Sequence, residues 1–229
     1  MKGHLVIALV LLALYPVGAQ EEVFLWPASL DTGRDAEYLT EDEKAVLLEM
    51  NMVRYNGAAY ARLYLQPMLA NFNGNFYALP GESSMYTHEG ARAVRECIAA
   101  LNKIANREPL LPARGLALAA RDHVRDTGPS GRTGHTGSNG STPSKRINRY
   151  GQWGKTCGEN ISYGYSGARD IMIQLLVDDG VSSREHRNNI LKQAYRYVGL
   201  SIGPHKTYEF MCVIDYAGDY TSNDSPEAP

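Results

Sequence analysis

Apolar side chains recur at three- and four-residue intervals in several stretches of the chain, a pattern that indicates helices burying one face. The longest stretch begins at Thr40 and ends before Pro67, and Thr40 with Glu43 has the spacing of a capping box. Thr142 followed by Pro143 predicts a further short helix. The same periodicity predicts helices over residues 88–104, 116–126 and 168–177.

Ser182 and Glu185 repeat the capping-box spacing, so we expect another helix from there to about Ala194. Runs of β-favouring residues, the last two with clear alternation, predict strands and a hairpin near Pro204 and His205. These strands cover residues 157–165, 198–202 and 208–216. A helical first half followed by a mixed second half is typical of an α+β domain with a small antiparallel sheet.

Composition divides the chain into four parts. Residues 1–19 begin with the basic Lys2, continue as an apolar run and end in small residues, as a removable signal peptide does. Residues 20–39 are expected to form an arm, residues 40–218 the domain, and residues 219–229 a flexible tail. We therefore expect a secreted protein, or a periplasmic one if the source is a Gram-negative bacterium. No stretch is apolar over enough residues to predict a membrane span.

Charge and cysteine content narrow the class of protein further. The 229 residues carry a net charge of −2, which gives no reason to expect nucleic acid as a partner. Three cysteines in a secreted chain predict one disulfide and one spare thiol. Cys157 and Cys212 both lie in expected strands, so we expect these two to pair and Cys97 to stay free, although the sequence leaves other pairings open.

Two histidines stand in settings that core packing does not explain. His135 lies in a loop, residues 127–141, that contains five glycines, and polar loop residues often carry function. His186 falls in the first turn of a predicted helix, where the helix dipole favours the neutral imidazole that binds a metal or accepts a proton. Either ring could instead only satisfy local backbone groups. His123, on the inner face of a predicted helix, is interpreted as a core histidine with a partner.

Three carboxylates complete the candidate set. Glu159 lies in an expected strand between a glycine and an asparagine, and three poor strand formers together indicate a role beyond strand propensity, unless this is an edge strand in water. Asp178 and Asp179 end a helix, where the dipole disfavours an acid by a few tenths to ~1 kcal/mol. An ion pair with Arg184 or Arg187, or a cation, should offset that cost.

These residue types support two kinds of chemistry. Neutral imidazoles such as His135 and His186 are ligands for a divalent metal, zinc among them. Carboxylates such as Glu159, Asp178 and Asp179 are candidate catalytic groups that transfer protons. Both depend on whether the segments meet in one cleft.

Three motifs together resemble the CAP family, which includes cysteine-rich secretory proteins, insect venom antigens and plant pathogenesis-related proteins. They are His135-x-Gly-x-x-Gly-Ser, Gly158-Glu159-Asn160-Ile161 and His186-Arg-x-Asn-Ile190-Leu191, the last typical of one branch of the family. The resemblance implies a three-layer α-β-α sandwich with a small antiparallel sheet. It also implies a cleft with two histidines, His135 and His186, and two acids. Glu159 is the first acid, and the second is Asp178 or Asp179. The choice between these two stays open, because the tryptophan that usually precedes the second acid is missing.

The resemblance implies a secreted binding protein that holds a divalent metal, often zinc, between the histidines. Its further ligand would be a lipid or sterol, a peptide or a protein. An alternative is a metal-dependent hydrolase, a peptidase or esterase, that uses Glu159 or an aspartate as its base. A third possibility is a surface module whose cleft is vestigial. The segment Met68–Arg107 is also longer than is usual in the family.

Overall fold

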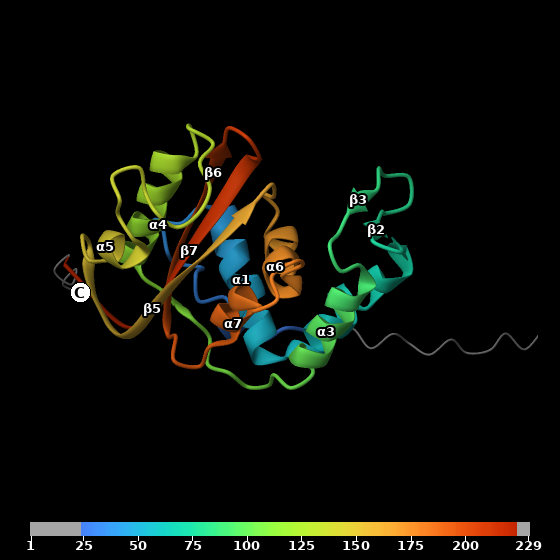
Figure 1. Cartoon of the computed structure of the whole chain (residues 1–229). Helices are drawn as coiled ribbons and strands as arrows, with labels where there is room; N and C mark the ends of the chain where they lie inside the picture. Colours follow the sequence, from blue (N-terminus) through green and yellow to red (C-terminus); the bar gives the residue numbers. More distant parts are fainter. Residues whose placement is uncertain (1–23, 224–229) are drawn as a thin grey trace, which may run out of the picture.

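A computed structural model describes residues 24–223 of the chain. The predicted signal peptide, residues 1–19, lies outside the described residues. The predicted α+β class is confirmed: a four-stranded sheet stands between two layers of helices (Figure 1).

Helix α1 (Glu41–Tyr55) begins at the predicted capping box. The Thr40 hydroxyl accepts a hydrogen bond from the backbone N–H of Glu43, and the Glu43 carboxylate accepts one from the backbone N–H of Thr40. The predicted single helix up to Pro67 is interrupted at Asn56, whose side chain accepts from the N–H of Ala59 and so caps a new helix. An asparagine side chain can compete in this way for backbone groups inside a helix. The run therefore divides into α1, α2 (Gly57–Tyr60) and a π-helical turn (Ala61–Leu65).

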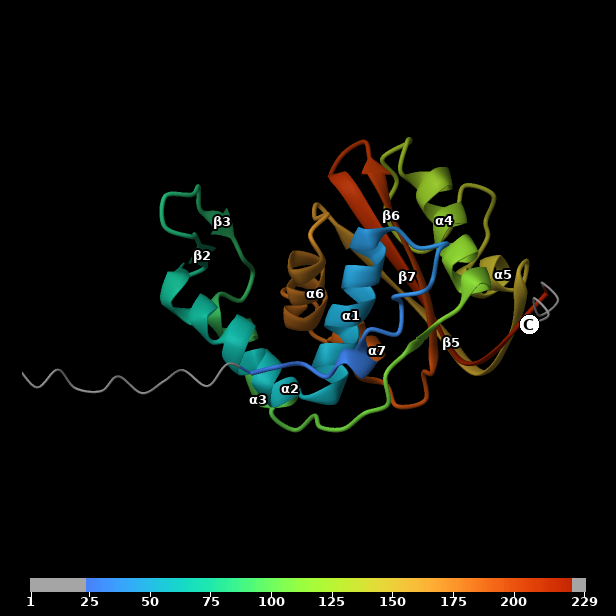
Figure 2. The same cartoon turned by 180° about the vertical axis from the view of Figure 1, so that it is seen from behind.

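The sheet has the strand order β4-β6-β7-β5. Strands β5 (Gly151–Tyr163) and β6 (Tyr197–His205) both pair antiparallel with β7 (Glu209–Ser222), and the two-residue β4 (Leu111–Pro112) pairs parallel with β6. Helices α4 (Arg114–Thr127) and α5 (Pro143–Ile147) cover one face. Helices α1, α6 (Ala168–Val177) and α7 (Glu185–Leu191) cover the other (Figures 1 and 2). The three-layer sandwich is thus present, with β5 at an edge of the sheet.

Close packing of β6 on α4 depends on Gly199. A Cβ atom at this position would overlap the backbone of Leu116 and Ala117 in α4. Only glycine lets the strand approach the helix this closely.

A separate subdomain lies next to α6, on the side of this helix that faces away from the four-stranded sheet (Figure 2). It consists of a 3₁₀ helix (Pro67–Asn71), three short antiparallel strands and α3 (Ala91–Leu101). The strands are β1 (Phe72–Asn73), β2 (Phe76–Tyr77) and β3 (Met85–Tyr86). We call residues 72–87 the hairpin segment. Strands of two residues have no measurable period, so the pattern of the sequence does not indicate them.

Several predicted boundaries are wrong. Strand β5 begins at Gly151 rather than Cys157, and α3 covers Ala91–Leu101 rather than residues 88–104. Two further differences are more informative. Helix α7 begins at Glu185 and ends at Leu191, and Ser182 does not cap it. Arg184 occupies the N-cap in a left-handed conformation, with φ of 52°, and the carboxylate of Asp178 accepts the N–H of His186 instead. At the other end of the domain, β7 continues to Ser222, so the start of the predicted tail is paired with β5.

The predicted disulfide between Cys157 and Cys212 is also wrong. Cys157 is opposite Ala217 in the sheet, and Cys212 is opposite Ser162. The two cysteines are therefore five register positions apart, about 17 Å along a strand, whereas a disulfide requires Cα atoms within about 7 Å. Cys97, Cys157 and Cys212 are all free thiols.

Candidate functional site

His135 and Glu159 form the first of two histidine–carboxylate pairs. Nδ1 of His135 lies 2.7 Å from Oε1 of Glu159. The Glu159 side chain is only 1% exposed, and its other oxygen forms an ion pair with the equally buried Arg146 of α5. A buried carboxylate needs such partners, because burying an unpaired charge costs several kcal/mol. The half-exposed imidazole of His135 is therefore held by a carboxyl group whose position is fixed.

The loop that carries His135 is held by its backbone at several points. The Nε2 atom of His123 hydrogen bonds to the carbonyl oxygen of Gly134 at 2.8 Å, and the N–H of Gly134 donates to the hydroxyl of Tyr163 at 2.9 Å. Arg146 donates to the carbonyl oxygens of His135 and Ser141, both at 3.0 Å. His123 is fully buried and has a partner, as predicted. Burial lowers its pKa, so the imidazole stays neutral.

Asp215 adds a buried acid that sequence reasoning missed. It lies on β7 directly opposite Glu159 of β5, and its side chain has no exposed surface. Burial raises the pKa of Asp215 well above the usual range, and the nearby Glu159 charge raises it further. Burial therefore favours the neutral form of the Asp215 carboxyl group.

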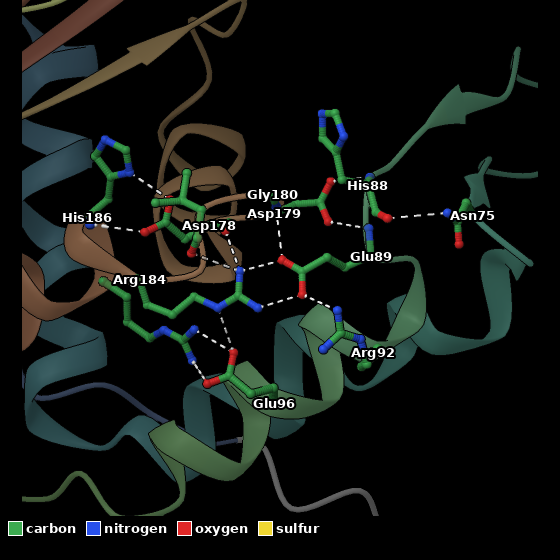
Figure 3. Close-up of polar contacts among 12 residues, drawn as sticks. Asn75, His88, Glu89, Arg92, Glu96, Asp178, Asp179, Gly180, Arg184 and His186 are labelled. Carbon is green, nitrogen blue, oxygen red and sulfur yellow. Dashed lines mark hydrogen bonds and ion pairs between the residues drawn. The ribbon is translucent and has the colours of Figure 1, made fainter.

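His186 and Asp178 form the second pair (Figure 3). Nδ1 of His186 lies 2.6 Å from Oδ1 of Asp178, and the backbone N–H of His186 donates to Oδ2 of the same carboxylate at 3.0 Å. Asp178 is almost fully buried, and its left-handed backbone, with φ of 54°, ends α6 and turns the side chain toward the start of α7. Asp178 lies at the C-terminal, negative end of α6, but its carboxylate accepts a hydrogen bond at the N-terminal, positive end of α7.

Asp179, the alternative candidate, has a different set of partners (Figure 3). Its carboxylate accepts the backbone N–H groups of His88 and Glu89, at 2.6 and 2.9 Å, just before α3. Of the two neighbouring acids, Asp178 is the one that pairs with a candidate histidine. Through these two hydrogen bonds Asp179 links the end of α6 to the subdomain.

The expected ion pairs of Arg184 or Arg187 with Asp178 or Asp179 are not formed. Arg184 instead pairs with Glu89 and Glu96 of the subdomain (Figure 3). Arg187 also pairs with Glu96. Arg184 reaches Asp178 only at its carbonyl oxygen, at 2.7 Å. Hydrogen bonds from Arg184 lower the pKa of Glu89 to about 2. This ion-pair cluster connects the subdomain to the segment that carries His186.

The two histidines approach the edge strand β5 from different layers. Glu159 points toward α5 and holds His135, whereas its neighbour Asn160 donates to the carbonyl oxygen of His186 at 2.9 Å. Successive side chains of a strand point to opposite faces, so Glu159 and Asn160 contact the two histidine-bearing segments from opposite faces of β5. Within residues 24–223, no three histidine, cysteine or acidic side chains are close enough to share a metal ion.

The chemistry of the donors nevertheless suits a metal bound by two histidines. In each pair the carboxylate engages Nδ1 and directs Nε2 elsewhere. Metal-binding histidines are commonly held by a carboxylate on their second nitrogen in this way. Any such metal would have His135 and His186 as its protein ligands, supported by Glu159 and Asp178.

A large cavity lies between α6 and the subdomain. Its volume is about 920 Å³, and its walls come from α6, the end of β5, the 3₁₀ helix and the hairpin segment. The lining is largely apolar and aromatic, with Met68, Phe72, Tyr165 and Ile173 among its residues. His186 and Asp178 also line it, whereas His135 and Glu159 do not. Sequence reasoning missed this cavity, because its walls come from segments about 100 residues apart.

Known proteins are similar to this chain in structure and in sequence. Two solved structures resemble the chain: an outer surface protein from Borrelia burgdorferi and an extracellular protein containing an SCP domain from Bacillus anthracis. The first has a TM-score of 0.40 and 18% identity, over 47% of this chain and 76% of that one. The second has a TM-score of 0.39 and 20% identity, over 49% of this chain and 34% of that one. The search among curated proteins finds no match.

The family models provide a longer match. The model of the cysteine-rich secretory protein family, CAP, matches residues 70–216, which is more than half of the chain and includes both histidine–carboxylate pairs. The protein therefore belongs to the CAP family of cysteine-rich secretory proteins.

Proposed function

We propose that this CAP-domain protein binds an apolar ligand, of the size of a lipid or sterol, in the cavity between α6 and the subdomain. The observation that carries the proposal is the cavity itself. Ligand sites in proteins usually have volumes of roughly 300–1,000 Å³ and mostly apolar walls with a few polar groups. At about 920 Å³, with His186 and Asp178 as polar groups on its wall, the cavity meets this description.

The experiment is titration of a fluorescent sterol or fatty acid into the purified protein. The variant Ile173→Trp should fill part of the cavity and weaken binding about tenfold or more, because Ile173 lines it. The matched control Ile98→Trp places the same ring on a partly buried isoleucine of α3 that does not line the cavity, and it should bind like the wild type. Equal affinities in all three proteins would reject the proposal. Binding of unstructured peptides in place of both probes would favour a peptide ligand.

A divalent metal at His135 and His186 is a second proposal. Its support is the carboxylate on Nδ1 of each ring, which leaves Nε2 available to an ion. Calorimetry with zinc should show binding that the double variant His135→Ala, His186→Ala loses. His88→Ala removes an exposed histidine outside the two pairs and is the matched control. Unchanged zinc binding in the double variant would contradict the proposal.

A hydrolase that uses the same groups makes a separate prediction. Glu159 is shielded and already engaged by His135 and Arg146, so His186 with Asp178 is the pair that faces a bound molecule. Turnover of an ester or peptide library that depends on His186 would support catalysis, and absence of turnover supports binding alone.

Export is expected from residues 1–19, and the N-terminus of the secreted protein should then be Gln20.

A further inference from the structure

The hairpin segment concentrates the exposed apolar surface of the molecule. Eight large apolar side chains are exposed among residues 24–223, and four of them lie inside this segment, between positions 76 and 86. Phe76 is 51% exposed, Leu79 43%, Met85 47% and Tyr86 60%. Scattered exposed apolar residues are normal, but a contiguous group marks an interaction site.

The same segment has almost no charge. From Gln66 to Thr87 the only acidic or basic side chain charged at neutral pH is Glu82, and there is no lysine or arginine. Protein interfaces are enriched in the same aromatic and methionine side chains, but they are also enriched in arginine and have a polar rim that forms hydrogen bonds. A surface of phenylalanine, tyrosine, leucine and methionine without basic residues instead matches the interfacial zone of a neutral lipid bilayer, where aromatic side chains are enriched.

The backbone of the hairpin segment is suited to this environment. Phe76 pairs with Tyr86 across β2 and β3, and Phe72 pairs with Tyr77 across β1 and β2. The N–H of Thr87 donates to the carbonyl oxygen of Asn75 at 2.8 Å. Backbone groups that are satisfied internally can approach lipid at lower cost, since lipid offers them no hydrogen bonds.

The exposed patch is continuous with the cavity. Leu79, Met85 and Tyr86 are exposed on the outer surface and also line the cavity wall. The rim of the cavity is therefore itself apolar. The hairpin segment that carries these side chains stands at the end of the molecule farthest from the four-stranded sheet (Figure 1). A lipid leaving a bilayer beneath this patch would pass directly over these three side chains.

We propose that the hairpin segment docks on a neutral lipid bilayer and that the cavity takes its apolar ligand directly from that surface. The second half of this statement rests on the proposed function, whereas the docking does not. Because no basic residue lies in the segment, docking should not require anionic lipid and should persist at high salt.

The test is co-flotation of the full protein with phosphatidylcholine vesicles. The variant Phe76→Ser, Tyr86→Ser should lose about tenfold or more in vesicle affinity, because two exposed aromatic side chains no longer enter the interface. The control Leu25→Ser, Leu111→Ser removes two exposed leucines outside the segment, 81% and 42% exposed, and should float like the wild type. Equal losses in the two variants, or no flotation of the wild type, would overturn the proposal.

A second variant adds charge without removing apolar contacts. Ser83 and Ser84 are exposed in the hairpin segment, so Ser83→Lys, Ser84→Lys should leave the fold intact. If the segment faces the bilayer, these lysines should strengthen binding to phosphatidylglycerol vesicles about fivefold or more in low salt and lose that gain in high salt. Unchanged affinity for the anionic vesicles would show that the segment does not face the lipid.

The two proposals fail in different ways. Ile173→Trp should float like the wild type but fail to extract a fluorescent sterol from vesicles, because Ile173 lies on the cavity wall. Undiminished extraction by Ile173→Trp would reject the cavity as the ligand site and leave docking in place. Undiminished flotation by Phe76→Ser, Tyr86→Ser would reject docking and leave the cavity in place.

Discussion

Replacing Arg146 by methionine should destabilise the protein more than any exposed charge change. Arg146 is 1% exposed and forms an ion pair with Glu159, whose side chain is equally buried. The same guanidinium donates to the carbonyl oxygens of His135 and Ser141. Methionine has a similar length but supplies neither the charge nor the donors. The variant Arg146→Met therefore leaves a buried carboxylate with His135 as its remaining partner.

The size of the effect follows from burial. Removing one partner of a buried ion pair costs roughly 3–5 kcal/mol, because the other charge remains in a low-dielectric environment. With a urea m-value of about 2 kcal/mol/M, the midpoint of unfolding should fall by about 1.5–2.5 M. The matched control is Arg149→Met, three positions along the chain. The Arg149 side chain is 41% exposed and pairs with the partly exposed Asp122 at 2.7 Å, an interaction worth about 0–1 kcal/mol.

The assay is urea unfolding followed by circular dichroism. The double variant Arg146→Met, Glu159→Gln should recover part of the lost stability, since no charge then remains unpaired. A loss below about 1 kcal/mol for Arg146→Met, or equal losses for Arg146→Met and Arg149→Met, would refute the reasoning. It would mean that Glu159 does not depend on Arg146 for its charge.

Two further predictions concern the ion-pair cluster and the thiols. The pKa of Glu89 is lowered to about 2 by Arg184, so this pair contributes stability above the unfolded pKa of about 4.3 and loses it as the pH falls toward 2. Glu89→Gln should therefore lower the melting temperature at pH 7 and flatten its fall between about pH 5 and pH 2, and a curve parallel to the wild type would contradict this. A thiol reagent should label the half-buried Cys157 in the native protein and reach Cys97 and Cys212 only after unfolding, because burial raises the pKa of Cys97 to about 12 and that of Cys212 further. Mass spectrometry after unfolding without reductant should find all three cysteines labelled, and a single label would indicate a disulfide.

Local signals in the sequence determined much of the secondary structure. The capping box at Thr40 starts α1, and the predicted bounds of α6 agree with the structure. The last two strands followed from alternation over several residues, and they form β6 and β7. These features depend on contacts within a few residues, which a sequence pattern records directly. Ser182 had the same local signal as Thr40, but Asp178 supplied the hydrogen bond from outside the helix.

The sequence also indicated some of the candidate site residues. His135 and Glu159 stood out because glycine-rich or strand-unfavourable surroundings gave them no packing role, and His186 stood out because it falls in the first turn of a predicted helix. The sequence alone could not show whether Asp178 or Asp179 pairs with a histidine, because two neighbouring aspartates have identical chemistry. The left-handed backbone of Asp178 decided it by directing the two carboxylates to different helices.

Tertiary structure alone decided which distant groups meet. Arg146 lies in a short polar helix and Asp215 in an alternating strand, and nothing near them in sequence indicates that both flank Glu159. The cavity depends likewise on how the hairpin segment stands against α6. The spacing of residues along the chain encodes helices, strands and turns, because these form over short distances. The environment of a buried charge or the volume between two layers depends on packing across the whole chain, so only the folded arrangement determines it.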